Sequence, residues 1–358
     1  MLRDTRAARF ASVRNMLLDG KSDAVLLTSI NNVRYLSGFT GSQAFLFLSR
    51  KRSFFVTDGR YETQAGIEVG HIPIKIESRS RIDAIASLAE RYSVRTLAIE
   101  YGDVNMDMFN ALRKRGLRMR PLDVPVERFR MIKDDLETTS IVKAVRIAEK
   151  AFLKIRPMIR PGTREVEIAL ALENEIRMLG SAKLPFEAIV ASGSRAALPH
   201  ARPTSRKLRK GDTVIVDWGA EWNGYFSDMT RTFILGGAGG EKRRVYDIVL
   251  EARDMAVNAV RAGVSMKDID KSARDRIDQA GYGQFFGHGT GHGVGLEVHE
   301  APRVSMLGTG TAELGMVFTI EPGIYLPGKG GVRVEDMVIV TAAGAKVITR
   351  LPRDPEIL

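Results

Sequence analysis

The chain has 358 residues, 44% of them hydrophobic, and its 54 basic and 43 acidic residues give a net charge of +11. This length favours two domains, and the absence of cysteine excludes disulfides, thiolate metal sites and a cysteine nucleophile. No apolar run approaches the roughly 18 residues of a membrane span, and the N-terminal segment lacks the apolar core of a signal peptide. We therefore expect a cytoplasmic protein with no membrane partner.

The first 128 residues alternate between helical and extended patterns. Predicted helices begin with an apolar stripe (Phe10, Val13, Leu17, Leu18) and continue at 60–69, 80–92 and 106–115, and predicted strands cover 24–28, 45–48, 54–56, 72–76 and 96–100. This alternation predicts a compact α/β domain over residues 1–128. The domain has one histidine, His71, and no clustered carboxylates, so we predict no chemistry in it.

A second domain is predicted over residues 129–358, after a candidate linker at 124–133 and a long helix that reaches about residue 158. Residues 160–180 then align without gaps on residues 261–281, and each segment has the pattern of a turn, a helix and a glycine stop. Two similar α/β halves in one domain predict a pseudo-two-fold arrangement with a site between the halves. Chance similarity of two helices is the alternative.

The surplus of positive charge is densest in one segment before residue 213. Its basic residues are Arg202, Arg206, Lys207, Arg209 and Lys210. The segment has no interleaved aromatic residues and no helical periodicity, which favours a solvated loop over a nucleic-acid surface. We therefore predict no nucleic-acid partner; the segment would at most bias the approach of anionic peptides to a nearby cleft.

The first pair of candidate site residues lies on a predicted hairpin. An apolar, β-branched run leads into Asp217, and Asn223-Gly224 favours a two-residue loop before Asp228. With that loop, residue 219 lies opposite residue 228 and shares a face with Asp217, because side chains alternate with period two. Two carboxylates on one face of an apolar hairpin repel each other unless a cation lies between them. The pattern favours a metal site; a strand end and a turn cap are the structural alternative.

A second acidic pair, Glu321 and Glu335, lies at the ends of two other apolar runs. A loop of five residues, 327–331, would place residue 335 opposite residue 323 and on the face of Glu321. The flanking runs have a buried pattern, and buried acids need partners. A polar hairpin with two exposed acids is therefore the less favoured interpretation.

Four of the five histidines lie in the second domain, three of them within a glycine-rich segment: His200, His288, His292 and His299. Glycines permit close backbone approach. The segment matches neither the dinucleotide-binding glycine spacing nor an H-E-x-x-H zinc helix. The histidines therefore favour a site of another kind.

Four carboxylates and one neutral imidazole make a ligand set whose charge would balance two divalent cations. Oxygen-rich ligation with one histidine suits Mn²⁺ or Co²⁺, with Zn²⁺ as a further candidate. Two metals about 3.5–4 Å apart bridge a water and lower its pKa. The reaction class that follows is metal-assisted hydrolysis.

Five motifs resemble those of the pita-bread metallopeptidases, a family that includes methionine aminopeptidase, aminopeptidase P and prolidase. They are D-W-G-A at 217–220, S-D-M-T-R-T at 227–232, H-G-x-G-H-x-x-G-L-x-V-H-E at 288–300, I-E-P-G-I-Y at 320–325 and R-V-E-D at 333–336. The resemblance covers residues 130–345. The sequence T-D-G-R-Y at 57–61 resembles the N-terminal domain of the aminopeptidase P, prolidase and creatinase branch. The implied fold is a creatinase-like α/β domain followed by a pseudo-two-fold pita-bread domain.

The resemblance also implies a role for each site residue. Asp217 would bind one metal, Asp228 and Glu335 would bridge two metals, and His292 and Glu321 would complete the other site. Glu321 would also carry the proton from the attacking water to the leaving nitrogen, His200 would contact the scissile amide, and His299 would stabilise the oxyanion. The pocket for a proline after the cut would be lined by His288, Tyr325 and Arg333.

The implied activity is that of a homodimeric Xaa-Pro aminopeptidase acting on peptides with proline at the second position, with a metal-bridged hydroxide as nucleophile. An Xaa-Pro dipeptidase stays open, because the sequence does not show the loops that would close the site beyond the proline. A non-catalytic binding module on the same fold is the alternative from another class. It is disfavoured because such modules have lost metal ligands, whereas all five ligands are present here.

Overall fold

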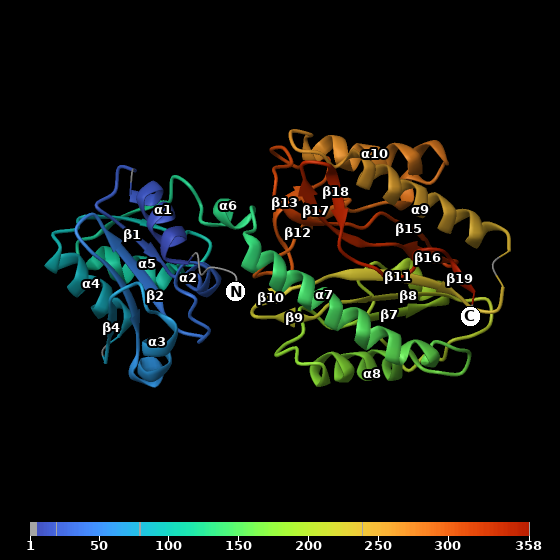
Figure 1. Ribbon diagram of the computed structural model, residues 1–358, viewed down its shortest axis with the longest axis horizontal. Helices are drawn as coiled ribbons and strands as arrows, with labels where there is room; N and C mark the ends of the chain where they lie inside the picture. Colours follow the sequence, from blue (N-terminus) through green and yellow to red (C-terminus); the bar gives the residue numbers. More distant parts are fainter. Residues whose placement is uncertain (1–5, 19, 79, 238, 358) are drawn as a thin grey trace. The chain divides into compact units, whose positions relative to one another are not determined.

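The computed structural model describes residues 6–18, 20–78, 80–237 and 239–357, and it divides into two compact units, Met1–Arg130 and Met131–Leu358 (Figure 1). Each unit has its own hydrophobic core. The division falls inside the predicted linker, which also carries a short helix, α6 (Glu127–Arg130). None of the described helices combines the length and the apolar character that a membrane span requires.

The N-terminal unit is a six-stranded sheet with helices, in the strand order β4-β3-β2-β1-β5-β6. Its elements are α1 (Arg6–Leu18), β1 (Ala24–Leu27), α2 (Ile30–Ser37), β2 (Phe45–Ser49), β3 (Ser53–Thr57), α3 (Glu62–Glu68), β4 (Ile74–Ile76), α4 (Arg81–Arg91), β5 (Thr96–Ile99), α5 (Met106–Lys114) and β6 (Arg118–Pro121). The predicted hairpin is confirmed as β2 paired antiparallel with β3. The predicted α/β character of this unit is confirmed.

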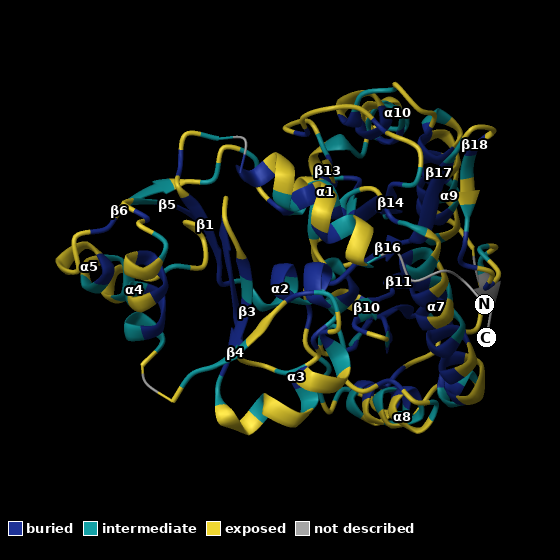
Figure 2. Ribbon diagram, turned by 60° about the vertical axis from the view of Figure 1, so that its left-hand side comes forward, coloured by how far each residue is buried: buried dark blue, intermediate teal, exposed yellow. Residues whose placement is uncertain are grey.

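Burial in this unit follows the apolar pattern of the sequence. All four residues of the predicted stripe on α1 are buried, and β1 and β2 are buried along their whole lengths, whereas α3 has a largely exposed surface (Figure 2). Besides α6, two elements of this unit were not predicted. Helix α2 has eight residues and no side-chain cap at Ser29, and β6 reads R-M-R-P, a basic segment that ends in proline. The sequence of β6 carries no usual strand signal, whereas α2 is bounded by Ser29, a common N-cap residue type, and by Gly38 in the left-handed conformation, so its local signals were present and were missed.

The C-terminal unit has two groups of strands, with α7 and α8 on one side and α9 and α10 on the other (Figure 1). Its elements are α7 (Asp135–Ile155), α8 (Glu165–Met178), β7 (Ile189–Ser192), β8 (Thr213–Trp218), β9 (Glu221–Trp222), β10 (Tyr225–Phe226), β11 (Met229–Ile234), α9 (Glu241–Ala259), α10 (Met266–Gln279), β12 (Gly291–Gly293), β13 (Glu300–Val304), β14 (Val317–Ile320), β15 (Gly323–Leu326), β16 (Gly330–Arg333), β17 (Asp336–Thr341), β18 (Gly344–Val347) and β19 (Glu356–Ile357).

The two halves of this unit repeat one arrangement. In the first half two helices, α7 and α8, precede strands in the order β11-β8-β7, and in the second half α9 and α10 precede strands in the order β17-β14-β12. The glycines shared by the repeat also share a left-handed backbone: φ is +96° at Gly162 and +89° at Gly263, and +99° at Gly180 and +84° at Gly281. A side chain at any of the four would be strained. The sequence repeat is therefore a structural repeat within one compact unit.

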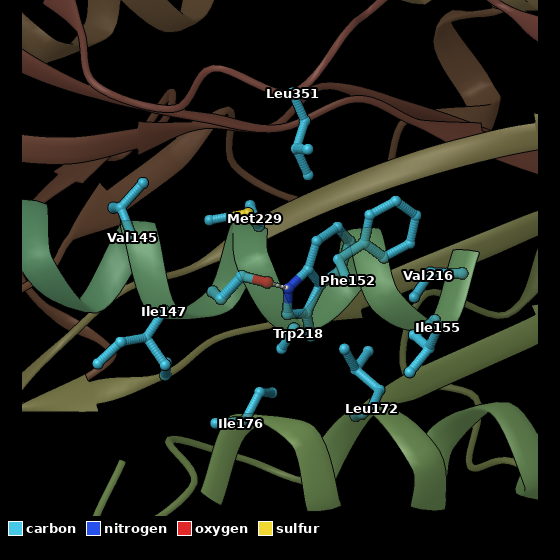
Figure 3. Close-up of a cluster of buried hydrophobic side chains, with 14 of the residues drawn as sticks. Val145, Ile147, Phe152, Ile155, Leu172, Ile176, Val216, Trp218, Met229 and Leu351 are labelled. Atoms are coloured by element: carbon cyan, nitrogen blue, oxygen red, sulfur yellow. Dashed lines mark hydrogen bonds between the residues drawn. The ribbon is translucent and has the colours of Figure 1, made fainter. Parts of the chain in front are cut away.

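A hydrophobic cluster fixes the strand that carries Asp217. The Trp218 indole is fully buried, stacks on Phe152 of α7 with ring centroids 4.5 Å apart, and lies beside Leu172 and Ile176 of α8 (Figure 3). Its Nε1 donates a hydrogen bond of 3.0 Å to the carbonyl of Ala148. Because neighbouring side chains on a strand point to opposite faces, burial of Trp218 in this cluster directs Asp217 to the other face of β8.

Candidate metal centre and active site

The first acidic hairpin has the predicted register. Tyr225 pairs with Trp222 across the two-residue loop, and Thr230 pairs with Asp217 further along. Asn223 and Gly224 both have positive φ, +51° and +82°, as a tight hairpin turn requires. Asp228 therefore lies two residues before Thr230, the partner of Asp217, which is the diagonal relation expected from the sequence.

The second acidic hairpin differs from the prediction. Leu326 pairs with Gly330, so the loop has three residues and not five. The same register holds on the other side of the acids, where Ile320 pairs with Asp336. Glu321 is thus placed directly opposite Glu335, and both carboxylates reach the same site. The glycine-rich sequence of this loop permits several closures, which is why its length could not be read correctly.

The structure brings six predicted site residues together. Three overlapping sets have ligand atoms that all lie within 4.8 Å of one another: Asp217, Asp228 and Glu335; His292, Glu321 and Glu335; and Asp228, His292 and His299. The first half supplies the two aspartates from the β8–β11 hairpin, and the second half supplies the glutamates and histidines. A single cluster is therefore built from both halves of the repeat.

Two carboxylate oxygens in this cluster lack any hydrogen-bond partner among the described residues. They are Oδ1 of Asp217 and Oε1 of Glu335, both buried. The other oxygen of each is held: Arg333 Nη2 donates to Asp217 Oδ2 at 2.6 Å, and Thr230 Oγ1 donates to Glu335 Oε2 at 2.7 Å. A buried, unpaired carboxylate oxygen is costly, and a divalent cation satisfies it. The donor set thus fits hard or borderline divalent metals.

The protonation of the cluster supports the same conclusion. Burial, together with the neighbouring carboxylates, raises the pKa of Asp228 and of Glu335 well above ordinary values. Burial also raises the pKa of Asp217, against the opposing charge of Arg333. The metal-free cluster therefore retains protons that a bound cation would displace.

His292 presents one nitrogen to the carboxylates. Its Nδ1 lies 3.1 Å from the carbonyl oxygen of Gly293 and donates to it, which leaves Nε2 3.3 Å from Glu321 Oε1 and 3.6 Å from Asp228 Oδ2. A backbone carbonyl that fixes the tautomer in this way is typical of metal-binding histidines. Burial alone would raise the pKa of Glu321, but the hydrogen bond and charge of His292 outweigh it and lower that pKa to about 2.

The cluster forms part of the wall of a cavity of about 800 Å³, which the predicted residues His200, His288, His299 and Arg333 also line. His299 is exposed and lies on a bend just before β13, with its ring 4.2 Å from that of His292. His200 is exposed on the loop after a 3₁₀ turn, Gly193–Ala197. The structure therefore brings the four histidines of this unit to one cavity.

Tyr325 does not line the cavity, although it was predicted to. It is buried behind the wall, where its hydroxyl accepts a hydrogen bond from Arg333 Nη1 at 2.8 Å and lies 2.9 Å from His288 Nε2. Burial raises its pKa to about 12, so the hydroxyl keeps its proton and donates it to His288. Tyr325 thus holds two cavity residues in place.

Two residues of the site were missed in the sequence. Thr230 holds Glu335 and accepts a hydrogen bond of 3.1 Å from Arg333 Nε, and its signal was its position two residues after Asp228, on the same face. Arg303 lines the cavity from β13, where it pairs with His292. Its only signal was an arginine at a strand position that faces the histidine segment.

Two repeated α/β halves that converge on four carboxylates and an imidazole define a metal-dependent hydrolase. Residues 139–342 match metallopeptidase family M24, and residues 9–132 match the creatinase/prolidase N-terminal domain. Among curated relatives, the chain is 37% identical to the Xaa-Pro dipeptidase of Pyrococcus horikoshii, over 93% of this chain and 94% of that protein.

Solved structures agree with this assignment. The Xaa-Pro dipeptidase from Bacillus anthracis has a TM-score of 0.94 and 38% identity, with 99% of each chain covered. The X-Pro aminopeptidase from Thermotoga maritima has a TM-score of 0.89 and 36% identity, covering 97% of this chain and 100% of that chain. The chain belongs to metallopeptidase family M24, in the branch with a creatinase/prolidase N-terminal domain, and is a metallo-exopeptidase.

Proposed function

We propose that the protein hydrolyses the Xaa-Pro bond of dipeptides with two divalent metal ions, Mn²⁺ being preferred. The observation that carries the proposal is the convergence of Asp217, Asp228, His292, Glu321 and Glu335 on the wall of one cavity, with buried oxygens that have no partner among the residues that the structure describes. The names of similar proteins, Xaa-Pro dipeptidase and X-Pro aminopeptidase, support the choice of bond.

The ligand roles follow from which oxygens the protein already holds. Within the described residues, Asp217 and Glu335 each offer one oxygen without a partner. Asp228 and Glu335 are the carboxylates that belong to more than one donor set, which suits bridging positions. When bound, two divalent ions would lower the pKa of an attacking water and polarise the scissile carbonyl. Ligation by oxygen with a single imidazole favours Mn²⁺ over softer metals.

Proton movement is assigned to Glu321. Its carboxylate belongs to a ligand set on the cavity wall, where it would lie beside the attacking water and accept its proton. It then delivers that proton to the proline nitrogen, which leaves as a secondary amine. His299 is suited to the oxyanion, because burial and the nearby His292 lower its pKa and keep the imidazole neutral, with one N–H to donate.

His200 and His288 complete the contacts with the substrate. His200 lines the cavity from the first half and would contact the scissile amide, whereas His288 and Arg333 would bound the proline pocket. Burial lowers the pKa of His288, so at neutral pH its ring is uncharged and presents a flat, weakly polar surface suited to a closed ring. Tyr325 acts from behind by fixing the orientation of both pocket residues.

The choice between a dipeptidase and an aminopeptidase rests on Arg303. Among the described residues its guanidinium has no carboxylate partner, and it lies on the cavity wall beside His292. A free carboxylate one residue beyond the cut would satisfy it, and a dipeptide ends in such a carboxylate. The sequence favoured the aminopeptidase; the position of Arg303 favours the dipeptidase.

Hydrolysis of Ala-Pro, Ala-Pro-Ala and Ala-Pro-amide, with Mn²⁺, Co²⁺ and Zn²⁺ titrated separately, tests the proposal. We expect Ala-Pro to be the best substrate and Mn²⁺ the best activator. Arg303→Ala should lower kcat/KM for Ala-Pro about 10–100-fold, the worth of a charged hydrogen bond, and leave Ala-Pro-amide nearly unaffected. Faster cleavage of Ala-Pro-Ala than of Ala-Pro would establish the aminopeptidase instead.

A further inference from the structure

The cavity histidines of the two halves lie on loops that are tied down by fully buried carboxylates. Glu165 on α8 and Asp270 on α10 both have 0% exposure. Neither lines the cavity and neither belongs to the metal-ligand sets. Each sits on the second helix of its half and reaches the loop that supplies a histidine to the cavity.

Glu165 closes the base of the loop that carries His200. Its Oε1 accepts hydrogen bonds from the backbone N–H and the hydroxyl of Ser192, at 2.8 and 2.7 Å. Its Oε2 accepts from the N–H and hydroxyl of Thr204, at 3.1 and 2.7 Å, and from Arg195 Nε at 3.1 Å. One carboxylate therefore joins the two ends of the segment 192–204, within which His200 lies.

Asp270 does the same for the segment around His288. Its Oδ1 accepts hydrogen bonds from the N–H and hydroxyl of Thr290, at 3.0 and 2.8 Å. Arg274 pairs with both oxygens of Asp270 at 3.0 Å and also donates to the carbonyl of His288 at 2.8 Å. The carbonyl of Thr290 in turn accepts from the N–H of Glu321 at 2.7 Å.

These carboxylates differ from those of the metal centre in one respect. Both oxygens of Glu165 and of Asp270 accept hydrogen bonds from protein donors, whereas Asp217 and Glu335 each keep one buried oxygen without a partner in the described part of the chain. Each is also paired with an arginine, Arg195 or Arg274, so its charge is compensated. Such groups are suited to holding neighbouring segments in place.

We propose that Glu165 and Asp270 are positioning residues, one in each half, that set the cavity positions of His200 and His288. The catalytic part of this inference rests on the proposed function, because it assumes that both histidines contact the substrate. The physical reason is geometric: a misplacement of about 1 Å at a catalytic group costs up to ~10²-fold in rate, and each of the two carboxylates is fully buried at the base of its loop.

Histidine-selective NMR tests the positioning itself, without any catalysis. The chain has five histidines, and His200→Ala and His288→Ala assign the two relevant imidazole signals. Glu165→Gln should shift or broaden the His200 signal and leave His288 unchanged, and Asp270→Asn should do the reverse. His71, in the N-terminal unit, is the internal reference.

A matched control removes a carboxylate of the same kind that holds a different segment. Glu149 is buried, pairs with Arg146 and accepts from the backbone N–H of Arg350. Glu149→Gln should leave both histidine signals and Ala-Pro turnover unchanged. If Glu149→Gln perturbs His200 and His288 as strongly as the two test variants do, the proposal is overturned.

Kinetics then tests whether the positioning matters for the reaction. Glu165→Gln should lower kcat/KM for Ala-Pro at least about 10-fold with metal content unchanged, and should cost almost nothing further in a His200→Ala background, because residues that act through one another are not additive. Full additivity of the two substitutions would reject the proposal.

Milder variants keep the test available if a carboxylate substitution prevents folding. Thr204→Val and Thr290→Val each remove one hydroxyl donor. Thr204→Val should shift the His200 signal and Thr290→Val the His288 signal, each by less than the corresponding carboxylate variant does. If the wild-type protein fails to cleave Ala-Pro while the variants show the expected spectral changes, the proposed function is rejected and the positioning role is kept. If the wild-type protein cleaves Ala-Pro and all four variants have unchanged spectra, only the positioning role is rejected.

Discussion

Glu100 of the N-terminal unit and the metal-centre residues Asp217 and Glu335 of the C-terminal unit are all buried, but their oxygens are satisfied in opposite ways. In the N-terminal unit, Glu100 accepts hydrogen bonds at both oxygens: from the backbone N–H groups of Thr28 and Ser29 at 2.5 and 2.9 Å, and from the Asn32 amide at 2.5 Å. In the C-terminal unit, Asp217 and Glu335 each leave one buried oxygen without a partner among the described residues. The first pattern tethers backbone; the second offers a ligand.

The comparison shows that burial alone does not identify a metal site. Burial raises the pKa of Glu100 just as it raises that of Asp228. The neighbouring groups differ. Asp228 lies among three further carboxylates, whose negative charges raise its pKa further, whereas Glu100 is surrounded mainly by hydrogen-bond donors. A buried carboxylate oxygen without a donor, close to other carboxylates, is the feature that distinguishes a metal site, because a bound cation would satisfy it.

Asp228→Asn should have the largest effect. Loss of a shared carboxylate should remove at least one metal ion per chain and nearly all activity. The metal-free protein should be no less stable than wild type, because burial and Glu335 both disfavour the ionised Asp228. Elemental analysis, Ala-Pro turnover and denaturant unfolding measure the three quantities. Retention of the wild-type metal content together with normal turnover would contradict the ligand assignment.

His292→Ala and His200→Ala should separate a ligand from a substrate contact. His292 presents Nε2 to Glu321 and Asp228, so its loss should lower metal content as well as rate. His200 is exposed in the cavity and outside every ligand set, so His200→Ala should keep its metal and lose about 10²–10³-fold in kcat, as for other transition-state donors. His299→Ala is expected to resemble His200→Ala. An emptied metal site in His299→Ala would instead make His299 a ligand, which its proximity to Asp228 allows.

Metal affinity should depend on pH in a defined direction. Asp228 and Glu335 have raised pKa values without metal, and a cation displaces their protons. Affinity should therefore fall as the pH falls through those raised values, and binding should release protons at any pH where the metal-free carboxyls still hold them. Calorimetric titration of Mn²⁺ in buffers of different ionisation enthalpy measures the release. The same heat in every buffer would show that the cluster binds metal without losing protons.

Much of this site could be predicted from the sequence because strands have a period of two. The Asn223-Gly224 turn fixed the register of Asp217 and Asp228. The length predicted for the second loop was wrong by two residues, an even number, so Glu321 and Glu335 were still placed on one face. The parts that could not be predicted depend on contacts distant in sequence. Tyr325 alternates like a cavity residue, and only packing shows that it lies behind the wall.

The positioning acids show the same limit more sharply. Glu165 lies in the first turn of a helix, where acids are common because they favour the helix dipole. Its sequence is indistinguishable from that of a surface position, and only the fold brings Ser192 and Thr204 to it. The buried, hydrogen-bonded role of Glu100 was not predicted for the same reason, because Glu100 follows an apolar strand and has the pattern of an ordinary strand end.

Glu100→Gln should give the smallest effect and the opposite signature from Asp228→Asn. Metal content and turnover should be unchanged. In wild type the folded-state pKa of Glu100 lies above its unfolded value, so its contribution to stability is complete below the ordinary glutamate pKa and is lost as the pH rises through the folded value. Hydrogen exchange at the Thr28 and Ser29 amides, corrected for the intrinsic rate, reports this locally. Protection in wild type should decline across that pH range, and Glu100→Gln should abolish the decline while lowering protection by less than about 3 kcal/mol, the cost of an unsatisfied buried donor. If the protection factors of the variant decline with pH as those of the wild type do, the pH dependence has another source, and Glu100 holds these amides without changing its protonation.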